Sequence, residues 1–177
     1  MFYNKDSKIA QIKLDTVNKP VLTGFTDSDW GNDIKDRISI AGYGFYFGPC
    51  LISWNSKKQA SVALSSCEAE YMALAHAAKE GLWLRALLEH LGISQQSATP
   101  LYCDNTAAIT VSKDPANHSR VKHIDMRYHF IRGVIESGAI QVRFIEGSNQ
   151  IADGFTKSLP KPKFLEFCDR IGLVEYH

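Results

Sequence analysis

The longest regular pattern in the sequence spans residues 65–91, where apolar side chains recur mostly at spacings of three and four. Such spacing lines one face of an α-helix with apolar groups. The side chains concerned are Tyr71, Leu74, Ala75, Ala78, Leu82, Leu84, Leu87 and Leu88. Gly92 follows as a helix stop signal. One long helix is therefore expected near the middle of the chain, and the segments around it decide the fold class.

Segments with strand patterns lie on both sides of this helix. They are residues 21–26, 42–48, 50–57, 100–103 and 140–145. The turn at Gly48 and Pro49 joins the second to the third, and their alternation predicts a hairpin with one buried face. Shorter helices are expected at 105–112, 121–136, 149–157 and 163–171. This order of elements indicates an α/β fold.

Composition narrows the class of protein. The chain of 177 residues fits one domain, and its net charge of +1 means that any affinity for phosphate comes from local patches. No run of about 18 apolar residues predicts a membrane span, and no signal peptide is visible. The cysteines form no Cys-x-x-Cys pair and indicate reduced thiols in an intracellular, cytoplasmic protein. They are Cys50, Cys67, Cys103 and Cys168.

Four acids stand where an expected strand ends or an expected helix begins. They are Asp27, Glu70, Asp104 and Asp153. A cluster of carboxylates is unfavourable unless cations neutralise it, and oxygen ligands favour Mg²⁺ or Mn²⁺. If these acids converge, the chain is a metal-dependent nuclease or another phosphoryl-transfer enzyme.

Glu70 is separated from its neighbour Glu68 by helix-capping chemistry. Ser65 and Glu68 fit a capping box, in which each side chain bonds the backbone N–H of the other residue. Glu70 then lies beside the apolar face of the helix, where a carboxylate requires a partner. A structural role such as helix capping is the ordinary explanation for such an acid. Here Ser65 and Glu68 are already expected to cap the helix, so capping does not explain Glu70.

The three aspartates also have structural explanations. Asp27 is the last residue in strand register, whereas Asp29 is expected in the following loop as a turn residue. Asp104 would serve as a helix N-cap, and Asp153 would complement a helix dipole. From the residues alone, structural roles and a metal site are equally supported.

Seven motifs, among them Thr-Asp-Ser-Asp-Trp, Glu-Ala-Glu-Tyr and Ile-Ala-Asp-Gly-Phe-Thr-Lys, occur in order along the chain. They occupy residues 24–31, 52–59, 62–74, 101–109, 118–125, 128–132 and 150–157. Together they resemble the ribonuclease H domain of copia-type retrotransposon polyproteins. The resemblance implies a ribonuclease H domain at 20–160, the tail of the reverse transcriptase connection region at 1–19 and a C-terminal helical extension at 161–177.

The resemblance also implies a fold, a reaction and a cofactor. The fold is a five-stranded mixed sheet, three antiparallel strands followed by parallel ones, flanked by helices. The reaction is endonucleolytic hydrolysis of the RNA strand of an RNA–DNA hybrid. Its cofactor is a pair of Mg²⁺ ions about 4 Å apart, for which Mn²⁺ would substitute. The family pattern assigns catalysis and metal binding to Asp27, Glu70, Asp104 and Asp153.

Substrate contacts are expected at Ser65, Ser66, Asn105 and His123, although helix capping is a rival role for Ser65. Many members of the family carry a histidine in the loop before the last acid. This chain has none at 146–149, so either the role is dispensable or His118 or His123 supplies it. A zinc site from these two histidines is disfavoured because no cysteine lies near them in sequence.

The basic residues between His118 and Arg132 form either a solvated helix face or a phosphate-binding patch. Trp54 and Trp83 are expected as core or support residues because the substrate is a duplex. The implied partners are the RNA–DNA hybrid and the polymerase domain of the parent polyprotein, within a virus-like particle. A catalytically weak hybrid-binding module is the alternative function, and an integrase-like strand-transfer domain has less support.

Overall fold

The computed structural model describes the backbone of residues 20–31, 35–113 and 122–173, and the side chains in these ranges except at 122–128. The predicted tail at 1–19 and His118 lie outside the described residues. Within the described part, no helix is both long and apolar enough to span a membrane.

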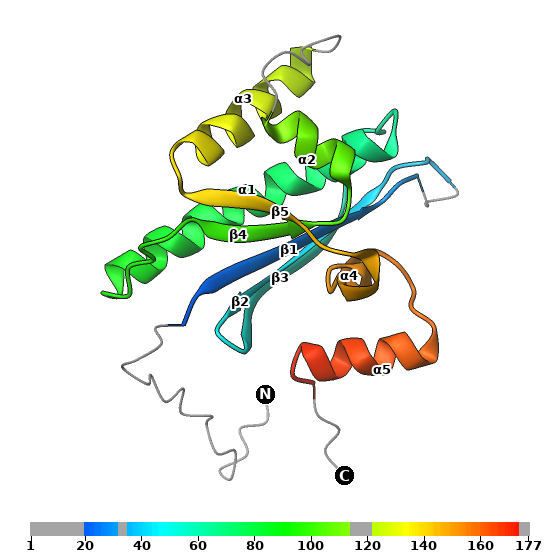
Figure 1. Cartoon of the computed structure of the whole chain (residues 1–177). Helices are drawn as coiled ribbons and strands as arrows, with labels where there is room; N and C mark the ends of the chain where they lie inside the picture. Colours follow the sequence, from blue (N-terminus) through cyan, green and yellow to red (C-terminus); the bar gives the residue numbers. More distant parts are fainter. Residues whose placement is uncertain (1–19, 32–34, 114–121, 174–177) are drawn as a thin grey trace.

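Five strands form one mixed sheet in the order β3-β2-β1-β4-β5 (Figure 1). They are β1 (Leu22–Asp29), β2 (Ile40–Phe47), β3 (Cys50–Lys58), β4 (Thr99–Cys103) and β5 (Ile140–Phe144). The first three strands pair antiparallel, while β4 pairs parallel with both β1 and β5. This arrangement confirms the predicted mixed sheet.

Helices cover both faces of the sheet. They are α1 (Ser66–His90), α2 (Thr106–Lys113), α3 (Lys122–Glu136), the 3-10 turn η1 (Gly147–Asn149), α4 (Asp153–Thr156) and α5 (Lys161–Arg170). Helix α1 packs on β1, β2 and β4, and it contacts α2 and α3 on the same side. Helix α4 packs on the opposite face of β1, β2 and β3, with α5 beyond it (Figure 1).

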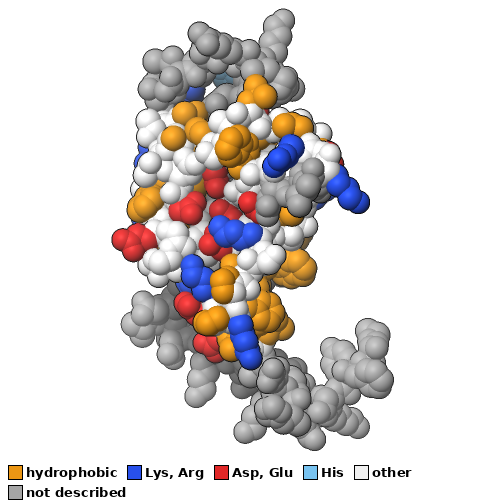
Figure 2. Space-filling view, turned by 90° about the vertical axis from the view of Figure 1, so that its right-hand side faces the viewer, with side chains coloured by type: hydrophobic (Ala, Val, Ile, Leu, Met, Phe, Trp, Pro, Cys, Tyr) orange, Lys and Arg blue, Asp and Glu red, His pale blue; other side chains and the backbone are white. Residues whose placement is uncertain are grey.

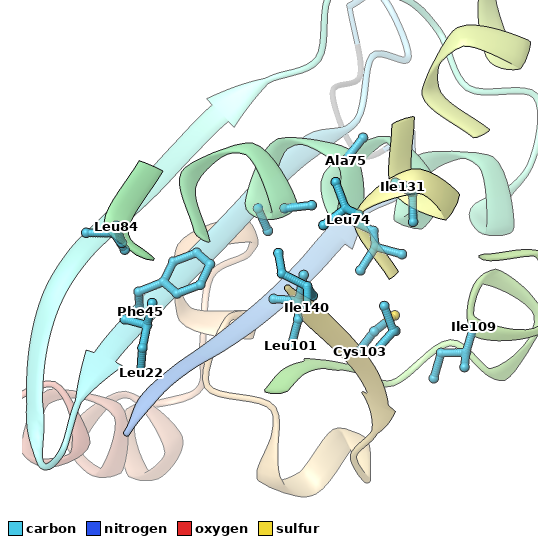
Figure 3. Close-up of a cluster of buried hydrophobic side chains, with 14 of the residues drawn as sticks. Leu22, Phe45, Leu74, Ala75, Leu84, Leu101, Cys103, Ile109, Ile131 and Ile140 are labelled. Carbon is cyan, nitrogen blue, oxygen red and sulfur yellow. The ribbon is translucent and has the colours of Figure 1, made fainter. Parts of the chain in front are cut away.

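The hydrophobic core lies between α1 and the sheet (Figure 3). Four of the five strands contribute fully buried side chains to it: Leu22, Phe45, Leu101 and Ile140. Full burial of a side chain of this size contributes about 1.5–3 kcal/mol to folding. The core therefore holds β1 and β4 side by side and fixes the relative position of their carboxyl ends.

Two local expectations are wrong, and a third holds only in part. A single helix at 149–157 is replaced by η1 and α4, because the buried side chain of Gln150 bonds other groups and interrupts the helix. Asp29 lies inside β1, paired with Ile40, and not in a loop. Trp54 and Trp83 are 62% and 57% exposed, so neither is a core residue. Trp54 nevertheless supports α4, since its ring stacks on Phe155 with centroids 5.7 Å apart.

Gly42 is required by the close approach of α4 to β2. A Cβ at this position would lie 2.8 Å from side-chain atoms of Phe155 and Thr156. We predict that Gly42→Ala destabilises the chain by about 1–3 kcal/mol through overpacking. Urea denaturation followed by circular dichroism measures the change.

The matched control is Gly133→Ala in α3, where an added Cβ meets nothing within 4 Å. This substitution should stabilise the chain by about 0.5–1 kcal/mol, because alanine has the higher helix propensity. Equal effects of the two substitutions would contradict the tight packing of α4 on the sheet.

Candidate metal centre

The parallel pairing of β1 with β4 brings two of the four acids together. Phe25 is the register partner of Tyr102, and each acid follows its partner by two residues: Asp27 lies within β1, and Asp104 directly follows the end of β4. Helix α1 places Glu70 in its second turn, and α4 begins at Asp153. All four acids therefore come from the same edge of the sheet or from helices that begin there.

Carboxylate oxygens of these acids lie within reach of one ion. One oxygen each from Asp27, Asp104 and Asp153 fall within 4.8 Å of one another. Glu70 and Asp104 form a second group of this kind with the sulfur of Cys103. Asp104 belongs to both groups, so the four acids converge. Figure 2 shows acidic side chains gathered near the middle of one face of the molecule.

Asp27 is buried and held in one orientation. Only 3% of the residue is exposed, and the hydroxyl of Thr156 donates to its Oδ2 atom. Burial raises the pKa of Asp27 to about 6, the Thr156 hydrogen bond and Lys157 oppose this change, and the charges of Asp153 and Asp104 add to it. A positive ion at this position would favour the ionised form.

Glu70 is the most strongly perturbed acid of the four. The backbone N–H of Ser28 donates to its Oε1 atom at 3.3 Å, and only 6% of the residue is exposed. Burial and the charges of Asp27 and Asp104 raise its pKa to about 9. Glu70 therefore holds a proton at neutral pH unless a cation replaces it.

Cys103 adjoins Glu70 but does not supply a thiolate. Its sulfur lies 3.9 Å from Oε2 of Glu70. Burial and the charge of Glu70 raise the pKa of the Cys103 thiol well above its usual range. The ionised donors are therefore carboxylate oxygens, the ligands that Mg²⁺ and Mn²⁺ prefer. This donor set fits such an ion.

Lys157 balances part of the negative charge. Its ammonium nitrogen lies 2.8 Å from Oδ1 of Asp153 and 4.0 Å from Oδ2 of Asp27. Burial lowers the pKa of Lys157, but the hydrogen bond with Asp153 and the nearby acids outweigh burial and raise it. The sequence pattern alone assigns no role to Lys157 or Thr156. The spacing of four residues between Asp153 and Lys157 is the signal that points to an ion pair.

Two of the predicted substrate-binding residues have structural partners. The Oγ atom of Ser65 accepts from the backbone N–H of Glu68 at 3.1 Å and caps α1. The carboxylate of Glu68 accepts from Leu64, not from Ser65 as a regular capping box requires. Asn105 caps α2, since its Oδ1 atom accepts from Ala108 at 3.0 Å.

Ser65 and Ser66 are both exposed, so capping leaves them accessible to a ligand. The side chain of His123, and most of the basic run from His118 to Arg132, lie outside the described side chains. Substrate contact by these residues therefore stays a prediction. The loop without a histidine does adjoin the acids, because a Cβ on Gly147 would lie 3.3 Å from Oδ2 of Asp104.

Sequence relatives of the chain include polyproteins of plant transposons, while no protein-family model matches it. The retrovirus-related Pol polyprotein from transposon RE2 of Arabidopsis thaliana is 42% identical over 154 residues. The one from transposon TNT 1-94 of Nicotiana tabacum is 43% identical over 152 residues. These matches cover 87% and 86% of the chain but only 11% of either polyprotein.

Solved structures with the same fold include ribonucleases H. The N-terminal RNase H domain of a Mycobacterium tuberculosis protein, solved as a fusion with maltose-binding protein, has a TM-score of 0.55 and 10% identity. It covers 85% of this chain and 97% of its own. LC11-RNase H1, isolated from compost, has a TM-score of 0.54 and 13% identity, with coverage of 77% and 93%. These likenesses confirm the predicted ribonuclease H fold.

The raised pKa values predict a pH-dependent stability in metal-free buffer. The folded chain keeps protons on Asp27 and Glu70 up to pKa values of about 6 and 9, whereas the unfolded chain releases them near pH 4. The free energy of unfolding should therefore fall as pH rises from about 4 to 9. Thermal melting in EDTA across this range measures it.

Glu70→Gln should flatten the upper part of this pH profile and raise Tm above that of the parent chain at pH 8. Each kcal/mol gained corresponds to about 2–4 °C for a chain of this size. Glu89→Gln, which removes an exposed carboxylate from the same helix, is the control and should keep the slope. A parent chain whose Tm rises between pH 6 and pH 8 would contradict a buried, protonated Glu70.

Proposed function

Because the chain is homologous to one segment of the Pol polyproteins of copia-type transposons and has the ribonuclease H fold, we propose that it is a metal-dependent endonuclease. Its substrate is the RNA strand of an RNA–DNA hybrid. The convergence of four carboxylates at one edge of the sheet carries this proposal. LC11-RNase H1, which shares the fold with a TM-score of 0.53 and 12% identity, has been crystallised with an RNA/DNA hybrid.

The proposed catalytic residues are Asp27, Glu70, Asp104 and Asp153, and they would hold two Mg²⁺ or Mn²⁺ ions. Bound ions of this kind supply an activated water and stabilise the leaving oxygen in phosphodiester hydrolysis. Asp104 contributes a ligand atom to both converging groups, beside Glu70 in one and beside Asp27 and Asp153 in the other.

The surrounding residues keep the acids in position for this chemistry. Thr156 orients the carboxylate of Asp27, and the N–H of Ser28 orients that of Glu70. Burial of Asp27 and Glu70 limits competing hydration and strengthens their attraction to a cation. Ser65, Ser66, Asn105 and His123 are proposed to contact the hybrid.

The proposed nuclease unit comprises residues 20–160, with 161–177 as a helical extension and 1–19 as part of the connection to a polymerase domain. The relatives are Pol polyproteins, which supports a polymerase domain in the parent protein. The proposed place of action is the cytoplasm, inside a virus-like particle, where reverse transcription produces RNA–DNA hybrids.

A labelled RNA–DNA hybrid incubated with the chain and Mg²⁺ tests the proposed activity. We expect cleavage of the RNA strand, which EDTA abolishes, and no cleavage of double-stranded DNA. Asp27→Asn and Glu70→Gln should each lower the rate about 100-fold or more, because each removes a charge that positions the cations. Product analysis on a denaturing gel measures the rate.

Asp29→Asn is the matched control, because Asp29 lies two residues from Asp27 on the same strand and outside the converging group. It should retain cleavage close to that of the parent chain. Cleavage that survives Asp27→Asn refutes the site assignment. A chain that binds the hybrid without cutting it would support the alternative, a hybrid-binding module that depends on its polymerase.

A further inference from the structure

Two buried glutamine side chains bond the residues on either side of Asp27 in β1. Gln59 follows β3 and is 5% exposed, and Gln150 follows η1 and is 4% exposed. Burial of a side-chain amide costs free energy unless its polar atoms find partners. The hydrogen-bond partners of both side-chain amides are chain neighbours of three of the four acids, Asp27, Glu70 and Asp153.

Gln59 joins β1 to the first turns of α1. Its Nε2 atom donates to Oγ of Ser28 at 3.2 Å and to the carbonyl oxygen of Ala69 at 2.9 Å. Ser28 follows Asp27 directly, and Ala69 directly precedes Glu70. One amide group thus connects the chain neighbours of two acids that belong to different elements.

Gln150 makes the corresponding link on the other side of Asp27. Its Nε2 atom donates to the carbonyl oxygen of Thr26 at 2.9 Å, and its Oε1 atom accepts from the N–H of Ala152 at 3.2 Å. Thr26 directly precedes Asp27, and Ala152 directly precedes Asp153. This second amide connects β1 to the turn that carries the last acid.

Both links avoid the carboxylates themselves. The two side-chain amides bond backbone groups and one serine hydroxyl, so these bonds leave the acid oxygens available to a cation. A neutral amide also adds no charge to a site where carboxylates repel one another. These features suit a residue that positions the acids without competing for the ion.

We propose that Gln59 and Gln150 are a pair of positioning residues that set the places of Glu70 and Asp153 relative to Asp27. This inference rests on the proposed function for its consequence in catalysis, but it concerns the geometry of the ion site itself. A role confined to stability would affect folding and leave the affinity for metal unchanged.

Gln95 provides a matched control because it makes similar bonds to the opposite end of β1. It accepts from the N–H of Leu22 at 2.9 Å and donates to the carbonyl oxygen of Pro20 at 3.4 Å. Gln95→Met removes these bonds far from the acids. It should cost stability comparable to that lost in Gln59→Met and Gln150→Met, and it should leave metal affinity and cleavage unchanged.

Isothermal titration of the 177-residue chain with Mn²⁺ tests the proposal, with Tm measured for each variant. We expect Gln59→Met and Gln150→Met to weaken Mn²⁺ binding by about 10-fold or more. Mn²⁺ affinity equal to that of the parent chain in both variants would overturn the proposal. If Gln59→Met does not fold, Ser28→Ala replaces it, since it removes one of the two acceptors, and unchanged affinity there would count equally against the proposal.

Cleavage of the hybrid by the same samples separates this inference from the proposed function. If the unsubstituted chain binds Mn²⁺ but cuts no hybrid, the nuclease proposal is refuted. The Mn²⁺ affinities of the variants alone then decide the role of the glutamines. A parent chain that cuts the hybrid, with variants that bind Mn²⁺ equally well, leaves the nuclease standing and refutes the positioning role.

Discussion

Repulsion among four carboxylates at one edge of the sheet is the constraint on which the rest of the site depends. Like charges within a few ångströms oppose one another, and burial increases the effect because less water screens them. Burial, and then the charges of the neighbouring acids, raise the pKa values of Asp27 and Glu70, and Lys157 offsets part of the negative charge by pairing with Asp153 and Asp27. Such an arrangement lowers the stability of the metal-free chain, and clusters of this kind characterise functional sites.

The two faces of β1 have different roles, since one packs in the hydrophobic core and the other presents Asp27. Leu22 and Gly24 face the core under α1, where a Cβ added to Gly24 would meet the side chains of Phe45 and Leu101. Asp27 lies on the opposite face, beside Thr156 of α4. Because successive residues of a strand alternate between faces, one strand both anchors the core and presents the acid. Packing of the apolar face of β1 thus supplies free energy of folding that offsets the repulsion among the acids.

Local patterns in the sequence were sufficient for elements whose stability is local in origin. The apolar spacing of α1 and the alternation around Gly48 identify a helix and a hairpin without tertiary information. The helix expected at 149–157 failed because Gln150 bonds Thr26, 124 residues away, and no local pattern records such a partner. Asp29 was misplaced for the same reason, since pairing with Ile40 decides where β1 ends.

Within the site, spacing and family pattern identify charged residues more readily than neutral ones. Lys157 bonds the acid oxygens that a cation would use, so a cation at Asp153 competes with it for Oδ1. Gln59 and Gln150 bond only neighbours of the acids and can keep their bonds when an ion binds. Lys157 therefore balances charge in the metal-free chain, whereas Gln59 and Gln150 would maintain the geometry of the acids when an ion is bound. If an ion displaced Lys157 from Asp153, the amide bonds would not have to break, so we expect the amides to hold the geometry common to both states.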